Sequence, residues 1–343
     1  MRRCVSVLIA VLLLAGLPAA EPAPVQVADP LFARYSELVA AYRAGNGAAV
    51  RQITTWPPSD LDRVLAPAAG NGDAFAEAAA LLHAEAAVAL ATTDWPRGSG
   101  HLTLAEALVQ ALPPSAEAFT ERFYAFVPTI ALLRGDPDGA RPAIDRALRL
   151  FEYGPHVRTA AGALEELFEH LADLECTAPG CGSGVPGGVV PVRLELAERH
   201  YRVALERDPA TLEARLRLGR VLALAGKNAD AEASLTTVID TGTVRAQYLA
   251  HLFRGAMAVG RGDMAAARAA YEAARTLAPG FQTPYLALSH LEETAGNSTR
   301  AQGLIAQMSA GGGAGTLDDP WWAYRNGGLD EEGLQWLRDH VRR

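Results

Sequence analysis

Cys176 and Cys181 are the residues of this sequence whose type and spacing most readily suggest redox or metal chemistry. Four residues separate them in a glycine-rich stretch, whereas a catalytic dithiol favours two intervening residues at an exposed helix N-terminus. A disulfide that closes so short a loop contributes about 2 kcal/mol in the chain-entropy model. We expect a structural disulfide between the two cysteines, with metal binding and redox chemistry as the alternatives.

Adjacent carboxylates could serve as general acid and base in a hydrolysis. The pairs Glu165-Glu166 and Glu292-Glu293 fall, by the helical periodicity around them, on faces turned to solvent. Glu166 and His170 stand four residues apart, where a surface pair is the ordinary interpretation. No two histidines have the i, i+4 spacing with an intervening glutamate that a helical zinc site uses. The sequence therefore predicts no catalytic residue and no metal site.

Two glycine-rich stretches, at 180–188 and 311–315, could be considered as phosphate cradles. Neither follows a predicted strand or carries the lysine and hydroxyl residue of a phosphate loop, so both are interpreted as connecting loops. The chain also lacks the Gly-x-Ser-x-Gly and Ser-x-x-Lys patterns of nucleophilic enzymes. We expect no cofactor and no enzymatic activity.

The C-terminal segment is rich in aromatic residues, with Trp321, Trp322 and Tyr324 followed by a predicted helix at 330–343. Such a density of aromatic side chains requires a surface to bury against. A terminal repeat must cover its exposed apolar edge, so we expect these residues to form a cap. The alternative is a docking element for another protein, because Trp and Tyr commonly anchor interfaces. As a cap, the two tryptophans are expected to pack on Leu288, Leu304 and Ile305.

The elements that position these residues are helices, because helical periodicity dominates from Leu31 onward. Small residues recur with a spacing of 34, 36 and 34 residues, at Ala197, Ala231, Ala267 and Ala301. Larger apolar residues follow these alanines at offsets of four and seven, which places them on one helical face. A period of 34 residues is that of a helix-turn-helix repeat.

Glycines mark the turns of these repeats: Gly226, Gly262 and Gly296 each stand five residues before an alanine of the series. Each is expected to end one helix of a pair. Gly219 and Gly255, seven residues before a turn glycine, are expected to let two helices approach closely. Together with Tyr271, Ala274 and Pro279, this pattern resembles the tetratricopeptide-repeat family, in a secreted bacterial form.

The same offsets recur more weakly upstream, at Gly135 with Ala140 and at Gly100 with Ala105. The surplus of residues between Ala140 and Ala197 predicts an insertion between two helices, 157–175 and 192–207. The expected organisation is a signal peptide at 1–20, a linker and helical cap at 21–72, degenerate repeat-like pairs at 73–211 with a cysteine-bearing insertion at 176–191, repeats at 212–310, and a glycine linker, aromatic segment and terminal helix at 311–343.

The N-terminus predicts export, because Arg2 and Arg3 precede an apolar run, 5–17, that ends in small residues. We expect cleavage near residue 20 and a periplasmic or secreted chain, with an uncleaved membrane anchor as the alternative. An oxidising compartment favours the disulfide between Cys176 and Cys181. The formal net charge of -8 argues against nucleic acid as a partner.

The predicted fold is thus all-α: stacked antiparallel helix pairs in a right-handed superhelix, with an N-terminal helical cap and a C-terminal aromatic tail. The family resemblance implies that the concave face, lined by the first helix of each pair, binds a peptide or protein. We expect a non-catalytic scaffold or assembly factor of the cell envelope. The alternative is an enzyme or binding protein that acts on envelope glycan, with Glu165, Glu166 or Glu169 in a deep cleft. The groove residues predicted from position are Leu216, Arg220, Leu252, Ala256, Leu286 and His290.

Overall fold

The computed structural model describes residues 29–134, 136–175, 192–310, 319–325 and 331–343, and these residues form helices and turns without any strand. None of the described helices is long and apolar enough to cross a membrane. The helices are α1 (Pro30–Arg43), α2 (Ala48–Ile53), α3 (Pro58–Ala69), α4 (Asp73–Leu90), α5 (Trp95–Gln110), the 3-10 turn η1 (Pro114–Ala116), α6 (Glu117–Leu133), α7 (Pro137–Leu150), α8 (Pro155–Glu175), α9 (Val192–Arg207), α10 (Leu212–Leu224), α11 (Asn228–Thr241), α12 (Val244–Gly260), α13 (Met264–Leu277), α14 (Thr283–Thr294), α15 (Ser298–Ala310), α16 (Pro320–Arg325) and α17 (Glu331–Arg342).

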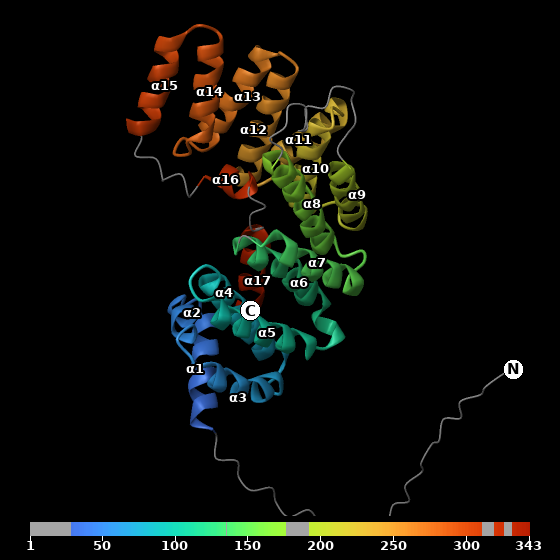
Figure 1. The fold of residues 1–343 in the computed structure, drawn as a ribbon, viewed down its shortest axis with the longest axis vertical. Coiled ribbons are helices and arrows are strands. Elements are labelled where there is room, and N and C mark those ends of the chain that lie inside the picture. Colours follow the sequence, from blue (N-terminus) through green and yellow to red (C-terminus); the bar gives the residue numbers. More distant parts are fainter. Residues whose placement is uncertain (1–28, 135, 176–191, 311–318, 326–330) are drawn as a thin grey trace, which may run out of the picture.

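Consecutive helices from α4 to α15 pack as antiparallel pairs, and the pairs stack side by side into a curved array (Figure 1). The first helices of successive pairs contact one another, as α6 with α8 and α10 with α12. They form the inner layer of the array, whereas the second helices form the outer layer. The prediction of an all-α array of stacked helix pairs is confirmed, and the first pair begins with α4 at Asp73.

The turns between paired helices follow the predicted glycines. Gly226, Gly262 and Gly296 have φ angles of 74°, 74° and 80°, in the left-handed region that favours glycine. After Gly226, the N–H of Lys227 reaches back to the carbonyl of Leu222 at 2.9 Å, which satisfies an end of α10 as in a Schellman motif. These glycines therefore stop the first helix and allow the second to fold back on it.

Close helix approach depends on small residues, as predicted. A Cβ added to Gly219 would lie 2.7 Å from the Leu235 side chain, and one added to Gly255 would lie 2.2 Å from the Tyr271 ring. Ala267, on the facing helix of the second contact, is completely buried. The upstream assignment of Gly100 as a turn glycine was wrong, because this residue lies inside α5. Asp94 instead caps that helix by accepting a hydrogen bond from the N–H of Arg97.

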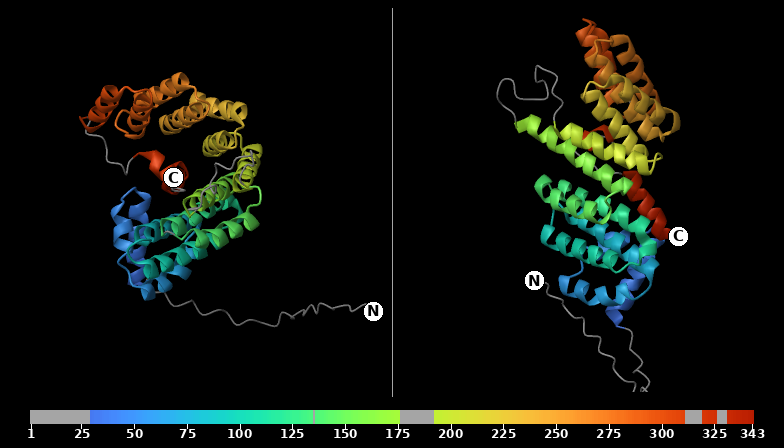
Figure 2. Two further views of the ribbon diagram at one scale, coloured as in Figure 1. Left: turned by 45° about the horizontal axis from the view of Figure 1, so that its top comes forward. Right: turned by 90° about the vertical axis from the view of Figure 1, so that its right-hand side faces the viewer.

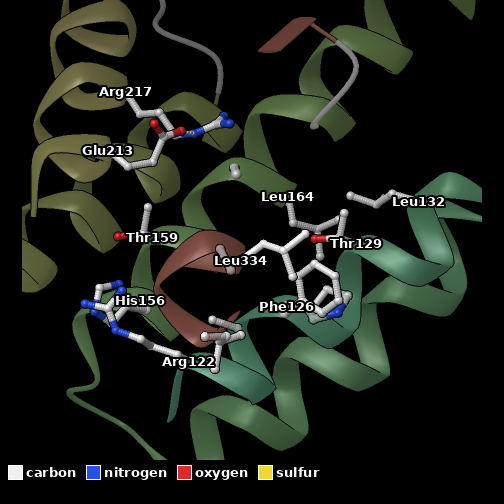
Figure 3. A pocket seen from close by; sticks show the side chains of 15 residues that line it. Arg122, Phe126, Thr129, Leu132, His156, Thr159, Leu164, Glu213, Arg217 and Leu334 are labelled. Carbon is white, nitrogen blue, oxygen red and sulfur yellow. Dashed lines mark hydrogen bonds and ion pairs between the residues drawn. The ribbon is translucent and has the colours of Figure 1, made fainter. Parts of the chain in front are cut away.

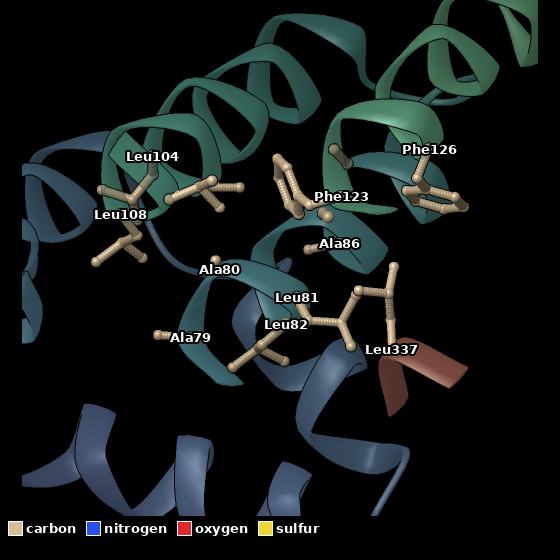
Figure 4. Close-up of a cluster of buried hydrophobic side chains, with 14 of the residues drawn as sticks. Ala79, Ala80, Leu81, Leu82, Ala86, Leu104, Leu108, Phe123, Phe126 and Leu337 are labelled. Carbon is tan, nitrogen blue, oxygen red and sulfur yellow. The ribbon is translucent and has the colours of Figure 1, made fainter. Parts of the chain in front are cut away.

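The N-terminal helices α1, α2 and α3 pack on α4 and α5 and extend the core of the first pairs. Alanine and leucine fill α4 so densely that most of its surface is buried, which suits a helix covered on several sides. Figure 4 shows this core, in which side chains of α4 lie between those of α5 and Leu337 of α17. A helix from the far end of the sequence thus completes the N-terminal core.

A buried chain of polar side chains crosses this N-terminal core. The hydroxyl of Tyr35 is 2.9 Å from Nε2 of His83, and Nδ1 of His83 is 2.7 Å from Nδ1 of His101. Both imidazoles are fully buried, and Nε2 of His101 has no hydrogen-bond partner among the described residues. Burial lowers the pKa of His83 well below its ordinary value. Burial and the charge of Arg97 lower the pKa of His101 to about 4.

We expect acidification to destabilise the protein through these histidines. An unfolded imidazole with a pKa of about 6.5 takes up a proton that the folded form does not, so stability is fully present above that pH and is lost as the pH falls toward 4. Melting temperatures measured from pH 7 to pH 4.5 should fall by several degrees, and less steeply in a His101→Gln variant. Parallel pH profiles for the two proteins would contradict this assignment.

Candidate partner-binding site on the inner face

The C-terminal tail crosses the inner face of the array (Figures 1 and 2). Its first helix, α16, packs against α12, and its second, α17, packs against α1, α4 and α6. We expected the aromatic residues to cover Leu288, Leu304 and Ile305 at the end of the array. Trp321 packs on Phe253 of α12, in the next-to-last pair, with the ring centroids 5.5 Å apart, and it belongs to one apolar cluster with Leu288 and Leu304. The side chain of Trp322 lies outside the described residues.

Asp319 fixes the start of α16 on the inner layer. This buried carboxylate accepts hydrogen bonds from the Tyr248 hydroxyl at 3.0 Å and from the N–H and hydroxyl of Thr283 at 3.0 and 2.7 Å. It also accepts one from the N–H of Trp321 at 3.1 Å, within the first turn of α16. One side chain therefore joins the tail to α12 and to the start of α14.

Tyr324 anchors the other end of α16. Its ring is buried beside Phe253, with the centroids 5.4 Å apart, and the guanidinium of Arg217 lies 4.0 Å from its centroid. A desolvated cation over an aromatic face is a favourable contact. Tyr324 was predicted to be either a cap or a docking residue, and in this structure it is covered by its own chain.

Arg217 belongs to a buried charged cluster, here called the Glu166 network: Glu166, Tyr201, Glu213, Arg217 and Arg220. Glu166 accepts hydrogen bonds from the Tyr201 hydroxyl and from Arg220, and it lies 3.6 Å from Arg217. Arg217 also pairs with Glu213 at 2.6 Å. Each charge in the network therefore has an opposite partner, as buried charges require. The expectation that Glu165, Glu166 and Glu292 face solvent was wrong, because all three are buried and paired with arginines.

The second tail helix, α17, lies with its apolar side in the N-terminal core. Leu334, Leu337 and Val341, at positions i, i+3 and i+7, are buried there, as expected for one face of an amphipathic helix. We call the surface of α1, α4 and α6 that α17 covers the tail groove. Figure 4 shows Leu337 lying beside residues of α4 and α6.

Polar contacts hold the rim of the tail groove. Arg338 contacts both oxygens of Glu85, at 2.8 and 3.2 Å, and His340 lies 3.3 Å from Glu77. On the opposite side, Nε of Arg43 donates to the carbonyl of Val341 at 3.0 Å. These contacts fix both the direction and the depth of α17.

A cavity of about 60 Å³ remains beside α17 on the inner face (Figure 3). It lies between α6, α8, α10 and α17, so it is built from the first helices of three neighbouring pairs. Its walls are mainly apolar, with Arg122, His156 and Thr159 on one side and Glu213 and Arg217 on another. This is a space into which an apolar side chain of a partner could fit.

The predicted groove residues have different positions in the structure. Leu216 and Leu252 are only 1 % exposed and belong to the core between helices, so their assignment to an open groove was wrong. Arg220 is part of the Glu166 network. The remaining three residues, Ala256, Leu286 and His290, are exposed on α12 and α14. Cys176 and Cys181 lie outside the described residues, and so does the side chain of His170.

Glu121 was missed by the sequence analysis. Burial raises the pKa of this carboxyl to about 7, although the N–H groups of Val157 and His156 act to lower it. Its Oε1 atom accepts a hydrogen bond from the N–H of Val157 at 2.8 Å, at the start of α8. A Cβ added to Gly154 would lie only 2.6 Å from this Oε1 atom, so the glycine leaves room for the carboxylate. In the sequence, Glu121 is an acidic residue among the buried aromatic positions of α6. Helical periodicity indicates that such a residue is buried, but not that it caps another helix.

Comparison with known proteins adds little to this description. No family model matches the chain, and no curated protein matches it. Solved structures that it resembles include a monomeric IFIT1 mutant with m7Gppp-AAAA, at 15 % identity and a TM-score of 0.45, covering 81 % of this chain and 66 % of that one. A monomeric IFIT1 mutant with Gppp-AAAA has 14 % identity and a TM-score of 0.45, covering 81 % and 67 %. The human IFIT1 dimer with PPP-AAAA has 14 % identity and a TM-score of 0.43, covering 82 % and 68 %. The present chain spans about two thirds of the length of those chains.

Proposed function

We propose that this chain is a non-catalytic interaction protein of the cell envelope that binds a protein partner through the inner face of its helical array. The observation that carries the proposal is that this face already holds a protein helix, α17, by apolar contacts and ion pairs. Stacked helix pairs create extended inner surfaces of this kind, and such surfaces commonly bind protein segments.

The tail leaves part of the inner layer open. Leu286 on α14 is 40 % exposed, and Ala256 on α12 and His290 on α14 are also exposed. These three residues are accessible on the first helices of the last two pairs. We therefore place the first contacts with the partner on α12 and α14.

A double substitution tests this surface. Ala256→Arg with Leu286→Asp should reduce partner recovery from an envelope extract at least tenfold, because it adds bulk and charge to the apolar contact surface. Since both residues are exposed, the melting temperature should change little. Met264→Asp is the matched control, because Met264 is similarly exposed but lies on the outer helix α13. Equal recovery with both variants would remove the inner face from the proposal.

A nucleic-acid partner is the competing outcome of this experiment. A gel-shift assay of the purified chain with 5′-triphosphate RNA should show no complex at physiological salt, since the net charge is negative. If an RNA complex forms and the double substitution Ala256→Arg with Leu286→Asp weakens it, the ligand of the inner face is RNA instead of a protein.

Export and the disulfide are further parts of the proposal. Mass spectrometry of the exported chain should find an N-terminus near residue 21 and a peptide that links Cys176 to Cys181. Free thiols at both positions, or a link between two chains, would refute the disulfide. An intact N-terminus in the membrane fraction would favour the anchor.

The glycan-directed alternative now depends on Glu121. Burial would raise the pKa of Glu165, but hydrogen bonds and charges of Arg141 and Arg193 outweigh this effect and hold it below the ordinary value. Glu166 is held by the Glu166 network, and none of Glu165, Glu166 and Glu169 lines the cavity beside α17. Glu121, by contrast, keeps a raised pKa and lines an open hollow with His156. A perturbed carboxyl in such a position is a candidate general acid. Release of reducing ends from envelope glycan, abolished by Glu121→Gln, would favour an enzyme.

A further inference from the structure

The tail groove binds α17 as a groove binds a separate amphipathic helix. Leu334, Leu337 and Val341 are inserted between α4 and α6, and at the rim Arg338 and His340 each contact a carboxylate of α4. A helix of twelve residues is marginal on its own in water, so α17 depends on the groove for its helical form. The geometry of recognition is therefore that of a helical ligand laid in a groove.

The groove is longer than the helix that fills it. The cavity of about 60 Å³ begins at Leu334 and Leu337 and continues along α6 and α8 toward α10. Figure 3 shows Leu334 pointing toward Phe126 and Leu164 across this space. A larger apolar side chain at the position of Leu334 would gain contacts that α17 does not make.

The rim of the groove determines the charge of its ligand. Glu77 and Glu85 lie on α4, and each faces a basic side chain of α17, His340 and Arg338 respectively. Tyr42 also donates a hydrogen bond to Glu85 at 2.7 Å, which holds the carboxylate in place. A ligand helix must therefore present a basic residue one position after its second apolar residue.

We propose that the tail groove is the docking site for an amphipathic helix of the partner, and that α17 occupies it as an internal competitor. The helix that displaces α17 carries apolar residues at i, i+3 and i+7, a basic residue at i+4, and a side chain larger than leucine at i. The larger side chain is required because a tethered helix competes at an effective concentration on the order of millimolar. This inference rests on the proposed function, since it concerns the partner that the inner face binds.

A labelled peptide of residues 329–343 tests the groove without knowledge of the partner. It should bind the full chain carrying Leu337→Asp at least tenfold more tightly than the unsubstituted chain, because the substituted α17 no longer competes. The same peptide with Leu334→Phe should bind about threefold or more tighter still, by filling the cavity. A second chain variant, Arg338→Glu, should release α17 by electrostatic repulsion from Glu85. It leaves the apolar face of α17 intact, so it provides an independent test if the Leu337→Asp chain misfolds.

Charge reversal tests the register of the helix. Adding Glu85→Arg to the Leu337→Asp chain should weaken the peptide at least tenfold, and a peptide with Arg338→Glu should recover the affinity. Glu206→Arg, an exposed reversal on α9, is the control and should change nothing. The proposal is overturned if the peptide binds the Leu337→Asp and Arg338→Glu chains no more tightly than the unsubstituted chain. It is also overturned if Glu85→Arg leaves the peptide affinity unchanged. The proposal is likewise overturned if the unsubstituted chain forms dimers that Glu85→Arg converts to monomers, because the groove would then bind α17 of a second copy of the chain.

The two proposals fail in different ways. If the peptide binds as expected but no partner is lost on Ala256→Arg with Leu286→Asp, the tail groove stands and the proposed function does not. If Ala256→Arg with Leu286→Asp abolishes partner recovery but the peptide binds neither the Leu337→Asp chain nor the Arg338→Glu chain, the proposed function stands and the exchange of α17 is refuted.

Discussion

Gly255→Ala is expected to lower the free energy of unfolding by about 1 to 3 kcal/mol, because the added methyl group overpacks a buried helix contact. The new Cβ would lie 2.2 Å from Cε1 of Tyr271 and within 2.7 Å of two other ring atoms. The Tyr271 ring is buried between α12 and α13, so it cannot swing away into solvent. The two helices must therefore separate, and the gain in helix propensity of about 1 kcal/mol only partly offsets that cost.

Gly260→Ala in the same helix is the matched control for this prediction. No atom lies within 4 Å of a Cβ built there, so the substitution should leave the melting temperature unchanged or slightly higher. Thermal unfolding of both variants, followed by circular dichroism, measures the difference. Similar melting temperatures would mean that α12 and α13 do not approach as closely as the structure places them.

The repeat itself was predictable because its signals are local. Turn glycines five residues before a buried alanine, and small residues seven before the turn, depend only on the geometry of one helix pair. The predicted insertion at 176–191 lies outside the described residues, between α8 and α9. Gly100 misled because it shares the offset of a turn glycine, whereas Asp94, which caps α5, carries the actual start signal.

The position of the tail was not predictable, because its contacts join residues far apart in the sequence. Arg338 pairs with Glu85 across 253 positions, and Arg43 binds the carbonyl of Val341 across 298. Aromatic density shows that a segment must be buried, but not on which surface. The same limit explains Leu216 and Leu252: periodicity assigns them to one face of a helix, and neighbouring pairs and the tail then cover that face.

Glu166→Gln is expected to lower the free energy of unfolding by about 2 to 4 kcal/mol, because the buried Arg217 then keeps Glu213 as its one carboxylate partner within the Glu166 network. The side chains of Glu166 and Arg217 are 4 % and 3 % exposed, so water cannot replace the lost interaction. The Tyr201 hydroxyl and Arg220 also lose a charged acceptor. This is the largest effect that we expect from any single substitution that preserves side-chain size.

Glu165 is the matched control for this prediction, because it is a buried acid whose arginine partners are partly exposed. Glu165 is equally buried and also pairs with two arginines, but Arg141 and Arg193 have side chains that are 36 % and 41 % exposed. Water can solvate both guanidinium groups once the charge on the acid is removed, so Glu165→Gln should cost only about 1 kcal/mol. Urea unfolding of the two variants decides the matter, and equal losses would refute the role of Arg217. Because Arg217 also lies over Tyr324, Glu166→Gln should increase hydrogen exchange in α16 as well, whereas Glu165→Gln should leave α16 protected.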